Sequence, residues 1–282
     1  MKIKHVKASK IFIYISMLAL IAFTMLPLIY MIEAAIKPLD ELLIFPPRFY
    51  VSNPTFNNFV NLFRNFDSSV VPFTRYIFNS ILTSVSAVGL TVIVSSMGAY
   101  ALAKIKVTGG NFIFSLIIAA LMFSPQVTQI PTFLIAKNLH IINTYFALII
   151  PKIAVAYNLF LLKQFADQIP DPLLEAAQID GASEWRMFWR VVMPMLKPAW
   201  STVIVLQFIA NWNDYFSPLI FIQSQELKTL PLALQLIGQS NLLATMGTMA
   251  AATFCMTIPT IIIFTLMQSR VVESMAFSGI KE

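Results

Sequence analysis

Six long apolar stretches constrain the fold of this chain more than any other feature of its sequence. They run over Ile11–Ile32, Ile77–Ala103, Phe112–Pro131, Asn143–Leu162, Ala199–Ile222 and Leu243–Met267. The hydrocarbon core of a bilayer is about 30 Å thick, and a helix of about 20 apolar residues crosses it. Lipid offers the backbone no hydrogen-bond partner, so stretches of this length form helices. We therefore predict an all-α transmembrane protein with six helices.

The composition agrees with lipid as the main solvent. Of the 282 residues, 58% are hydrophobic and 11% are charged, and the mean hydropathy is +0.76. A soluble domain carries about 25% charged residues. So much apolar surface cannot be hidden in one water-soluble core of this size.

Residues for metal or catalytic chemistry are scarce. The chain has one cysteine, Cys255, and two histidines, His5 and His140, so it holds neither a disulfide framework nor a Cys/His zinc pattern. It also lacks the G-x-x-x-x-G-K-[ST] phosphate loop and the H-E-x-x-H motif. We expect no metal site, no cofactor and no enzymatic activity on this chain.

The formal charge of +6 reflects membrane topology and does not require nucleic acid as a partner. If the N-terminus lies inside, twelve of the 19 Lys and Arg residues fall on cytoplasmic pieces and six on external ones. Basic residues gather on the cytoplasmic side, so we place both termini there. The cytoplasmic set is Lys2, Lys4, Lys7, Lys10, Lys104, Lys106, Lys163, Arg186, Arg190, Lys197, Arg270 and Lys281.

The spans divide the chain into five parts. They are a cytoplasmic N-terminus (1–10), a first transmembrane helix (11–32), an external loop (33–75), a core (76–268) and a cytoplasmic tail (269–282). The core includes a cytoplasmic loop (163–198) that is too long to be a simple turn. This loop is the most informative part of the sequence.

The cytoplasmic loop has the local chemistry of two short helices joined by a turn. Asp171 is a good N-cap, and Pro172 suits the first helical position. Gly181 is placed to end that helix in a left-handed turn. Ser183 can then cap a second helix, and Pro194 punctuates the approach to the next span. We predict a compact helix–turn–helix element outside the membrane.

The same loop resembles the EAA loop of ABC importer permeases, whose pattern is E-A-A-x3-G-x9-I-x-L-P. Glu175, Ala176 and Ala177 match the triplet, and Gly181 and Pro194 follow at the expected spacing. Val191 and Met193 replace Ile and Leu. The resemblance implies a coupling helix that docks on an ATPase subunit, with Glu175 and Asp180 in the docking region, Gly181 shaping the turn and Phe188 as an apolar anchor. The alternative is an amphipathic linker whose Trp residues lie in the headgroup region.

The resemblance extends over nearly the whole chain. Five spans resemble the core of type I (MetI-like) permeases, preceded by one extra helix. The external loop, Trp212-Asn213-Asp214 and Phe277-Ser278-Gly279 resemble the smaller permease of maltose-type carbohydrate importers. This implies a bacterial or archaeal cell (inner) membrane, a second related permease, two ATPase subunits that hold ATP and Mg, and an external solute-binding protein.

Polar residues inside the spans mark a candidate translocation path, because such groups tend to face a bundle interior or a watery route. Span five carries four at helical spacing, and Pro218 predicts a kink beside them. The alternative is hydrogen bonding that only holds helices together, at about 0.6 kcal/mol per contact. We expect Lys152 to extend to the interface or to meet a helix-end carbonyl. The candidates are Gln207, Asn211, Asp214 and Tyr215 in span five, Gln126 and Gln129 in span three, and Asn158 with Tyr157 in span four.

Two other classes of function remain as alternatives. An ion-coupled secondary transporter would use intramembrane carboxylates and inverted repeats. Asp214 is the one carboxylate well inside a span, and we find no convincing repeat. A membrane enzyme lacks a catalytic constellation here. The sequence therefore favours the permease of an ATP-driven importer of a sugar or oligosaccharide.

Overall fold

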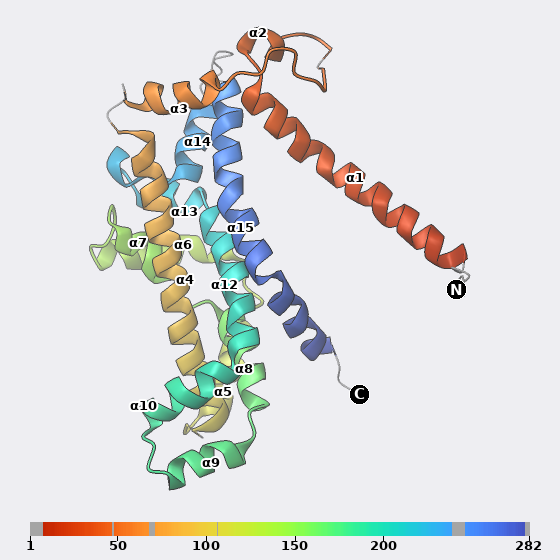
Figure 1. Cartoon of the computed structure of the whole chain (residues 1–282). Coiled ribbons are helices and arrows are strands. Elements are labelled where there is room, and N and C mark those ends of the chain that lie inside the picture. Colours follow the sequence, from red (N-terminus) through yellow and green to blue (C-terminus); the bar gives the residue numbers. More distant parts are fainter. Residues whose placement is uncertain (1–7, 47, 68–70, 106, 239–245, 280–282) are drawn as a thin grey trace. The chain divides into compact units, whose positions relative to one another are not determined.

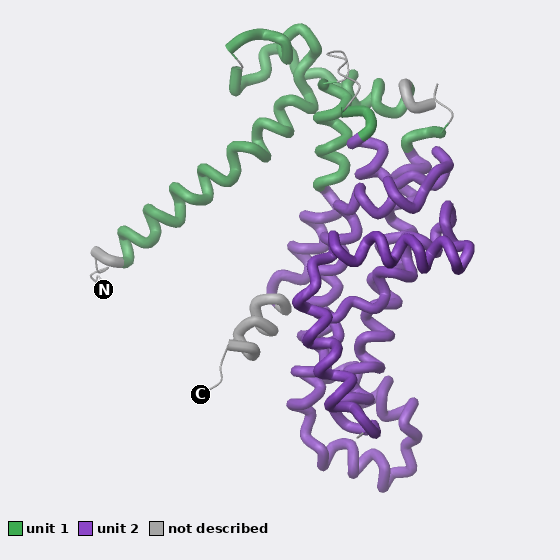
Figure 2. The backbone as a smooth tube through the Cα atoms, turned by 180° about the vertical axis from the view of Figure 1, so that it is seen from behind, with its two compact units in different colours: residues 1–73, 236–257 green, residues 74–235, 258–282 purple. Residues whose placement is uncertain are grey.

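The computed structural model describes residues 8–46, 48–67, 71–105, 107–238 and 246–279, and the regular elements within these ranges are helices. The chain forms two compact units, which Figure 2 distinguishes by colour. Unit 1 comprises residues 1–73 and 236–257, and unit 2 comprises residues 74–235 and 258–282. Each unit is considered by itself below.

Unit 1 is built on α1 (Ala8–Ile36), a long apolar helix. Most of its membrane-capable stretch, Lys10–Ile36, is not buried within the chain, and the buried residues are Ala34 and Ala35 near its end. The external loop that follows is ordered by α2 (Leu39–Leu42) and α3 (Asn57–Asp67). The Asn58 amide of α3 donates to the carbonyls of Ala35 at 3.0 Å and Lys37 at 2.7 Å, so α3 is tied to the end of α1.

The first part of α15 (Met246–Gly279) also belongs to unit 1, and Gly247 lies against Asn58 there. A Cβ atom on Gly247 would approach the Asn58 side-chain Cγ to 2.7 Å, closer than real Cβ atoms come. The Asn58 amide has little freedom to move away, because both of its hydrogen bonds hold it in place. Glycine at this position is therefore required by the close approach.

We predict that Gly247→Ala destabilises the protein by about 1–3 kcal/mol, the usual range for overpacking. The measurement is denaturant unfolding in detergent. Gly89→Ala in α4 is the matched control, because nothing lies within 4 Å of its added Cβ, and it should be neutral or stabilising by up to about 1 kcal/mol. Equal stability of the two variants would contradict the packing account.

Unit 2 contains most of the predicted core and includes nearly all of the long helix α4 (Phe73–Lys104). Three further predicted spans are assembled from shorter pieces (Figure 1). They are α5 (Gly110–Ala120), α6 (Pro125–Asn138), α7 (Tyr145–Ile149), a 3-10 turn (Ile150–Lys152), α8 (Ala156–Asp167), α12 (Lys197–Trp212) and α13 (Phe216–Phe221). A 3-10 turn (Gln225–Leu227) and α14 (Leu230–Gly238) lead towards α15.

The predicted all-helical transmembrane fold class is confirmed, and the structure adds that three of the six predicted spans are broken or bent. Within the part of the chain that the structure describes, three unbroken helices are long and apolar enough to cross a membrane: Lys10–Ile36, Phe73–Lys104 and Met246–Ser269. The count reaches six only if each of three bent helix pairs is one span. Leu243, the predicted start of the last span, lies outside the described residues.

Proline accounts for two of these breaks. The stretch Phe112–Pro131 is divided into α5 and α6, which meet at 112°. Pro125 is the first residue of α6, and the residue before it, Ser124, is extended, as the Pro ring demands. The stretch Asn143–Leu162 bends by 42° after Pro151. The apolar content of these stretches does not by itself predict either break.

The third bent pair joins Glu184–Met195 to Lys197–Trp212 at 77°. A separate break interrupts the predicted span Ala199–Ile222. α12 ends at Trp212, and α13 begins at Phe216 after a short irregular segment. The interruption falls at Asp214, where the missing N–H of Pro218 predicted a kink. It is a complete break, however, so Asp214 and Tyr215 do not continue the helical face of Gln207 and Asn211.

Candidate functional site

The predicted coupling loop folds as α9 (Asp171–Ile179) and α10 (Glu184–Met187), followed by a π-helical segment (Phe188–Val192) and α11 (Met193–Met195). It lies at the Lys104 end of α4 (Figure 1). The neighbouring helices take some of the predicted loop residues: α8 extends to Asp167 and α12 starts at Lys197.

Gly181 ends α9 as its position predicted. Its φ is +76°, a left-handed conformation that disfavours other residues. The Ala182 N–H donates to the Ala177 carbonyl and the Gly181 N–H to the Gln178 carbonyl, both at 2.9 Å. These two bonds form a Schellman motif, which satisfies the last carbonyls of the helix.

Asp171 is not the N-cap of α9 that the sequence predicted. The helix begins at Asp171 itself, with Pro170 at the cap position. The Asp171 carboxylate instead lies 2.7 Å from the Lys104 ammonium, which also donates to the Ile169 carbonyl at 2.6 Å. The start of α9 is thus fixed to the end of α4.

The second helix of the loop is also tied to α4. Ser183 caps α10 as predicted, its hydroxyl accepting from the Arg186 N–H at 3.4 Å. The Tyr100 hydroxyl donates to Glu184 Oε2 at 2.8 Å. Both helices of the loop therefore have a polar contact with the last turns of α4.

Phe188 anchors the loop inside its own chain. It is 3% exposed and packs in a core cluster with Tyr100, Leu174 and residues of α8 and α12. Its ring centroid is 6.2 Å from that of Tyr100 and 5.1 Å from that of Trp189. Phe188 therefore packs within this subunit and offers little surface to a partner.

The outer face of α9 remains exposed. Glu175, Ala176, Asp180 and Gly181 are exposed, Ala177 is half-buried, and Pro194 is exposed on α11. Ile179, which the sequence analysis did not single out, is 87% exposed at the end of α9. Ile179 is therefore a candidate contact residue for a partner protein. Its position two residues before Gly181 could have suggested this from the sequence.

A polar cavity of about 410 Å³ opens between the end of α4 and the two loop helices. Three carboxylates line it, from Asp171, Glu175 and Glu184, against a single ammonium from Lys104. No described hydrogen bond or ion pair involves the Glu175 carboxylate. The cavity is therefore acidic and offers one carboxylate to an outside partner.

An ion pair at the two helix breaks is the main polar feature of the candidate path. Lys152 Nζ lies 2.7 Å from Asp214 Oδ2, and each side chain is 19% exposed. This corrects the expectation that Lys152 extends outward or meets a carbonyl. The signal was present in the sequence, because charges inside a membrane usually pair with one another.

Two predicted amides join the same network. The Asn158 amide donates to Gln207 Oε1 at 2.9 Å, and the Gln207 amide donates to the Lys152 carbonyl at 3.2 Å. That carbonyl also accepts from the Thr91 hydroxyl at 2.9 Å. We call Thr91, Lys152, Asn158, Gln207 and Asp214 the polar network.

The other predicted path residues do not join the polar network through any described hydrogen bond. Asn211 has a buried amide nitrogen with no partner among the described residues. Tyr215 and Tyr157 are exposed. On α6, Gln126 is exposed and Gln129 half-buried. The structure thus unites Asn158, Gln207 and Asp214 and leaves the remaining candidates separate.

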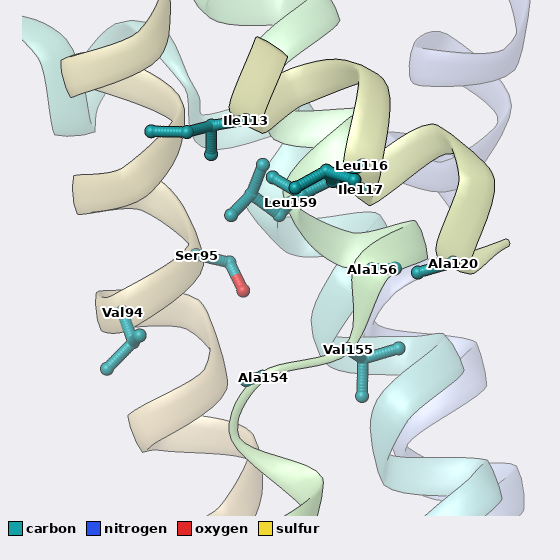
Figure 3. A pocket seen from close by; sticks show the side chains of 10 residues that line it. All are labelled: Val94, Ser95, Ile113, Leu116, Ile117, Ala120, Ala154, Val155, Ala156 and Leu159. Atoms are coloured by element: carbon teal, nitrogen blue, oxygen red, sulfur yellow. The ribbon is translucent and has the colours of Figure 1, made fainter. Parts of the chain in front are cut away.

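A second cavity, of about 340 Å³, lies between α4, α5 and the start of α8 (Figure 3). Nine of its ten lining residues are apolar, and Ser95 contributes the one hydroxyl. Figure 3 shows apolar side chains such as Ile113, Leu116 and Val155 around it. This lining suits a hydrocarbon group and offers too few polar partners for a hydroxyl-rich solute.

We predict that loss of either member of the Lys152–Asp214 pair costs about 3 kcal/mol, because the remaining buried charge has no partner. Asp214→Asn and Lys152→Met should each destabilise strongly, and the double variant should recover much of the loss. Denaturant unfolding of the three variants measures this coupling. Asn keeps the oxygen that accepts backbone N–H groups, so the comparison isolates the charge.

The control for this cycle is the pair of Lys163 and Asp167, 2.8 Å apart with the Asp side chain 38% exposed. Its disruption should cost less than about 1 kcal/mol. A double variant of Lys152 and Asp214 that is no more stable than its single variants would contradict a coupled buried pair.

The fold and this site define a class: a helical membrane transport subunit with broken spans, a polar network at the breaks and a helix–turn–helix loop. The chain belongs to the family of binding-protein-dependent transport system inner membrane components, whose family model matches residues 95–276. It is accordingly a permease subunit of an ABC importer, as the EAA-like loop predicted.

Permeases with similar sequences align with nearly the full length of this chain. The arabinooligosaccharides transport system permease protein AraQ of Halalkalibacterium halodurans is 31% identical, over 93% of this chain and 94% of AraQ. The lactose transport system permease protein LacG of Rhizobium radiobacter is 28% identical, over 92% of this chain and 93% of LacG. A chain in the crystal structure of a bacterial ABC transporter that imports alginate has the same fold, with a TM-score of 0.82, 24% identity and coverage of 94% and 98%.

Proposed function

We propose that this permease carries a sugar or short oligosaccharide across the membrane. The names of its relatives support this cargo, because AraQ and LacG are permeases for arabinooligosaccharides and lactose. The polar network is chemically suited to such a solute. Its one ion pair is internally neutral, and neutral amides bind hydroxyl groups without requiring a charge on the solute.

The energy for transport comes from partner ATPase subunits that dock on the coupling loop. The observation that carries this proposal is the exposed outer face of α9, where Glu175 and Ile179 stand on a helix held by the Gly181 turn and the buried Phe188. ATP and Mg bind to those partners and not to this chain, whose sequence has no phosphate loop.

The complete importer includes a second, related permease and an external solute-binding protein. The family description, a binding-protein-dependent transport system, supports the latter. Both termini lie in the cytoplasm of a bacterial or archaeal cell (inner) membrane, in line with the distribution of Lys and Arg. ATP-driven closure of the ATPase pair draws the coupling loops together and turns the cavity outward, and hydrolysis resets it.

The competing proposal, an ion-coupled carrier, requires an intramembrane carboxylate that is free to bind a proton or a cation. Asp214 is poorly suited to that task. Its Oδ2 is engaged by Lys152, and its Oδ1 accepts from the Phe216 and Ser217 N–H groups, each at 3.0 Å. These contacts favour a structural role for the carboxylate.

We predict that Ile179→Asp and Glu175→Ala each reduce the ATPase recovered with this permease at least tenfold, while the second permease still co-purifies. The reason is that both residues lie on the exposed face of α9, where neither side chain has a hydrogen bond or ion pair among the described residues. The measurement is purification of the tagged permease from its native membrane in mild detergent, with quantitative mass spectrometry of the associated subunits.

Gln225→Ala is the matched control, since this exposed residue lies beyond α13, outside the coupling loop. It should leave ATPase recovery unchanged. Undiminished recovery from both loop variants would overturn α9 as the docking helix. Recovery of the wild-type permease alone, stable and homogeneous, would favour the ion-coupled carrier.

A further inference from the structure

Three of the exposed aromatic side chains in the external loop lie within six residues of one another: Phe45, Phe49 and Tyr50. Phe45 is 91% exposed, although water is a poor solvent for a phenyl ring. We refer to these residues as the aromatic tip. We propose that the aromatic tip inserts into the outer lipid–water interface and fixes the depth of α1 in the bilayer.

The position of Phe49 sets the depth of the aromatic tip. Its ring centroid lies 6.5 Å from that of Tyr30 in an edge-to-face contact. Tyr30 belongs to α1, whose apolar stretch ends at Ile36, about 9 Å further along at about 1.5 Å per residue. The 27 residues of that stretch exceed the length that a core of about 30 Å requires. The last turns of α1, and Phe49 with them, therefore lie in the interfacial region.

Hydrogen bonds hold the loop against the end of α1. The Lys37 ammonium, on a residue only 4% exposed, donates to the Arg48 carbonyl. The Thr55 N–H donates to the Ile36 carbonyl at 2.8 Å, and Asn58 donates to the Lys37 carbonyl. Residues 48, 55 and 58 of the loop are thus held next to residues 36 and 37 at the end of α1.

The loop also has a polar part, which distinguishes it from a generally apolar surface. The Glu41 carboxylate accepts from the Ser52 and Asn53 N–H groups at 3.0 and 2.8 Å. Asp40 and Asn53 are exposed. The Arg48 guanidinium lies 5.8 Å from the centroid of the Tyr50 ring, so a cation accompanies the aromatic tip. Aromatic rings with a flanking Arg are the side chains that the interface favours.

The structure favours lipid as the partner of the aromatic tip, because the aromatic tip continues the surface of a membrane span. Phe49 packs directly on α1, whose apolar stretch is not buried within the chain except at Ala34 and Ala35. This inference needs α1 to cross the membrane, but it is independent of the cargo and of ATPase docking. Its failure and the failure of the proposed function are therefore distinguishable.

The test measures the depth of a nitroxide label in the intact complex, reconstituted into phosphatidylcholine and phosphatidylglycerol vesicles. Replacing the single cysteine (Cys255→Ser) and using partner subunits without cysteine leaves one labelled site per complex. Phe45→Cys and Tyr50→Cys report on the aromatic tip. Asp40→Cys and Asn53→Cys are matched controls on the same loop. Collision rates with oxygen, which concentrates in lipid, and with a water-soluble nickel chelate give the environment of each label.

We expect the labels at positions 45 and 50 to have an oxygen-to-nickel collision ratio several-fold above that of both controls. A ratio equal to that of the controls would place the aromatic tip in water and overturn the proposal. Low collision rates with both reagents would also overturn it, because they would show that another protein covers the aromatic tip. Phe45 is so exposed that its replacement does not put folding at risk.

Discussion

The polar network of this permease depends on one constraint: every backbone polar group in lipid needs a hydrogen-bond partner. A helix broken at membrane depth exposes N–H and carbonyl groups that have no water to bond with. Here the network side chains fill that need. Asp214 accepts the first N–H groups beyond one break, and the Lys152 carbonyl at the other break accepts from Thr91 and Gln207. The Lys152–Asp214 pair then joins the two breaks.

The same unit connects this network to the coupling loop. α12 carries Gln207 and also contributes to the apolar cluster that buries Phe188. α4 carries Thr91 near its middle, and its last turns contact α9 and α10 through Lys104 and Tyr100. Because the loop is fixed to these helices, a displacement at the loop surface is transmitted to the helices that hold the polar network. We propose that this connection is the physical basis for coupling ATPase closure to transport.

The sequence predicted the features that depend on local chemistry. Apolar length identified the spans, the left-handed turn at Gly181 followed from its position, and Ser183 capped the second loop helix. The sequence did not predict the features that depend on tertiary contacts. The 112° bend between α5 and α6 leaves apolar content unchanged, and the burial of Phe188 depends on three distant helices. The partner of Lys152 could have been found, since the rule that intramembrane charges pair left Asp214 as the available carboxylate.

The central claim is that ATP hydrolysis by docked partners, and not an ion gradient, drives movement of solute through this permease. The most direct measurement is uptake of a radiolabelled arabinooligosaccharide or lactose into proteoliposomes that contain the whole complex and its binding protein, with ionophores that collapse all ion gradients. The account predicts uptake that requires Mg-ATP on the coupling-loop side and persists with the gradients collapsed. Uptake driven by an imposed proton or sodium gradient in the absence of ATP would contradict it.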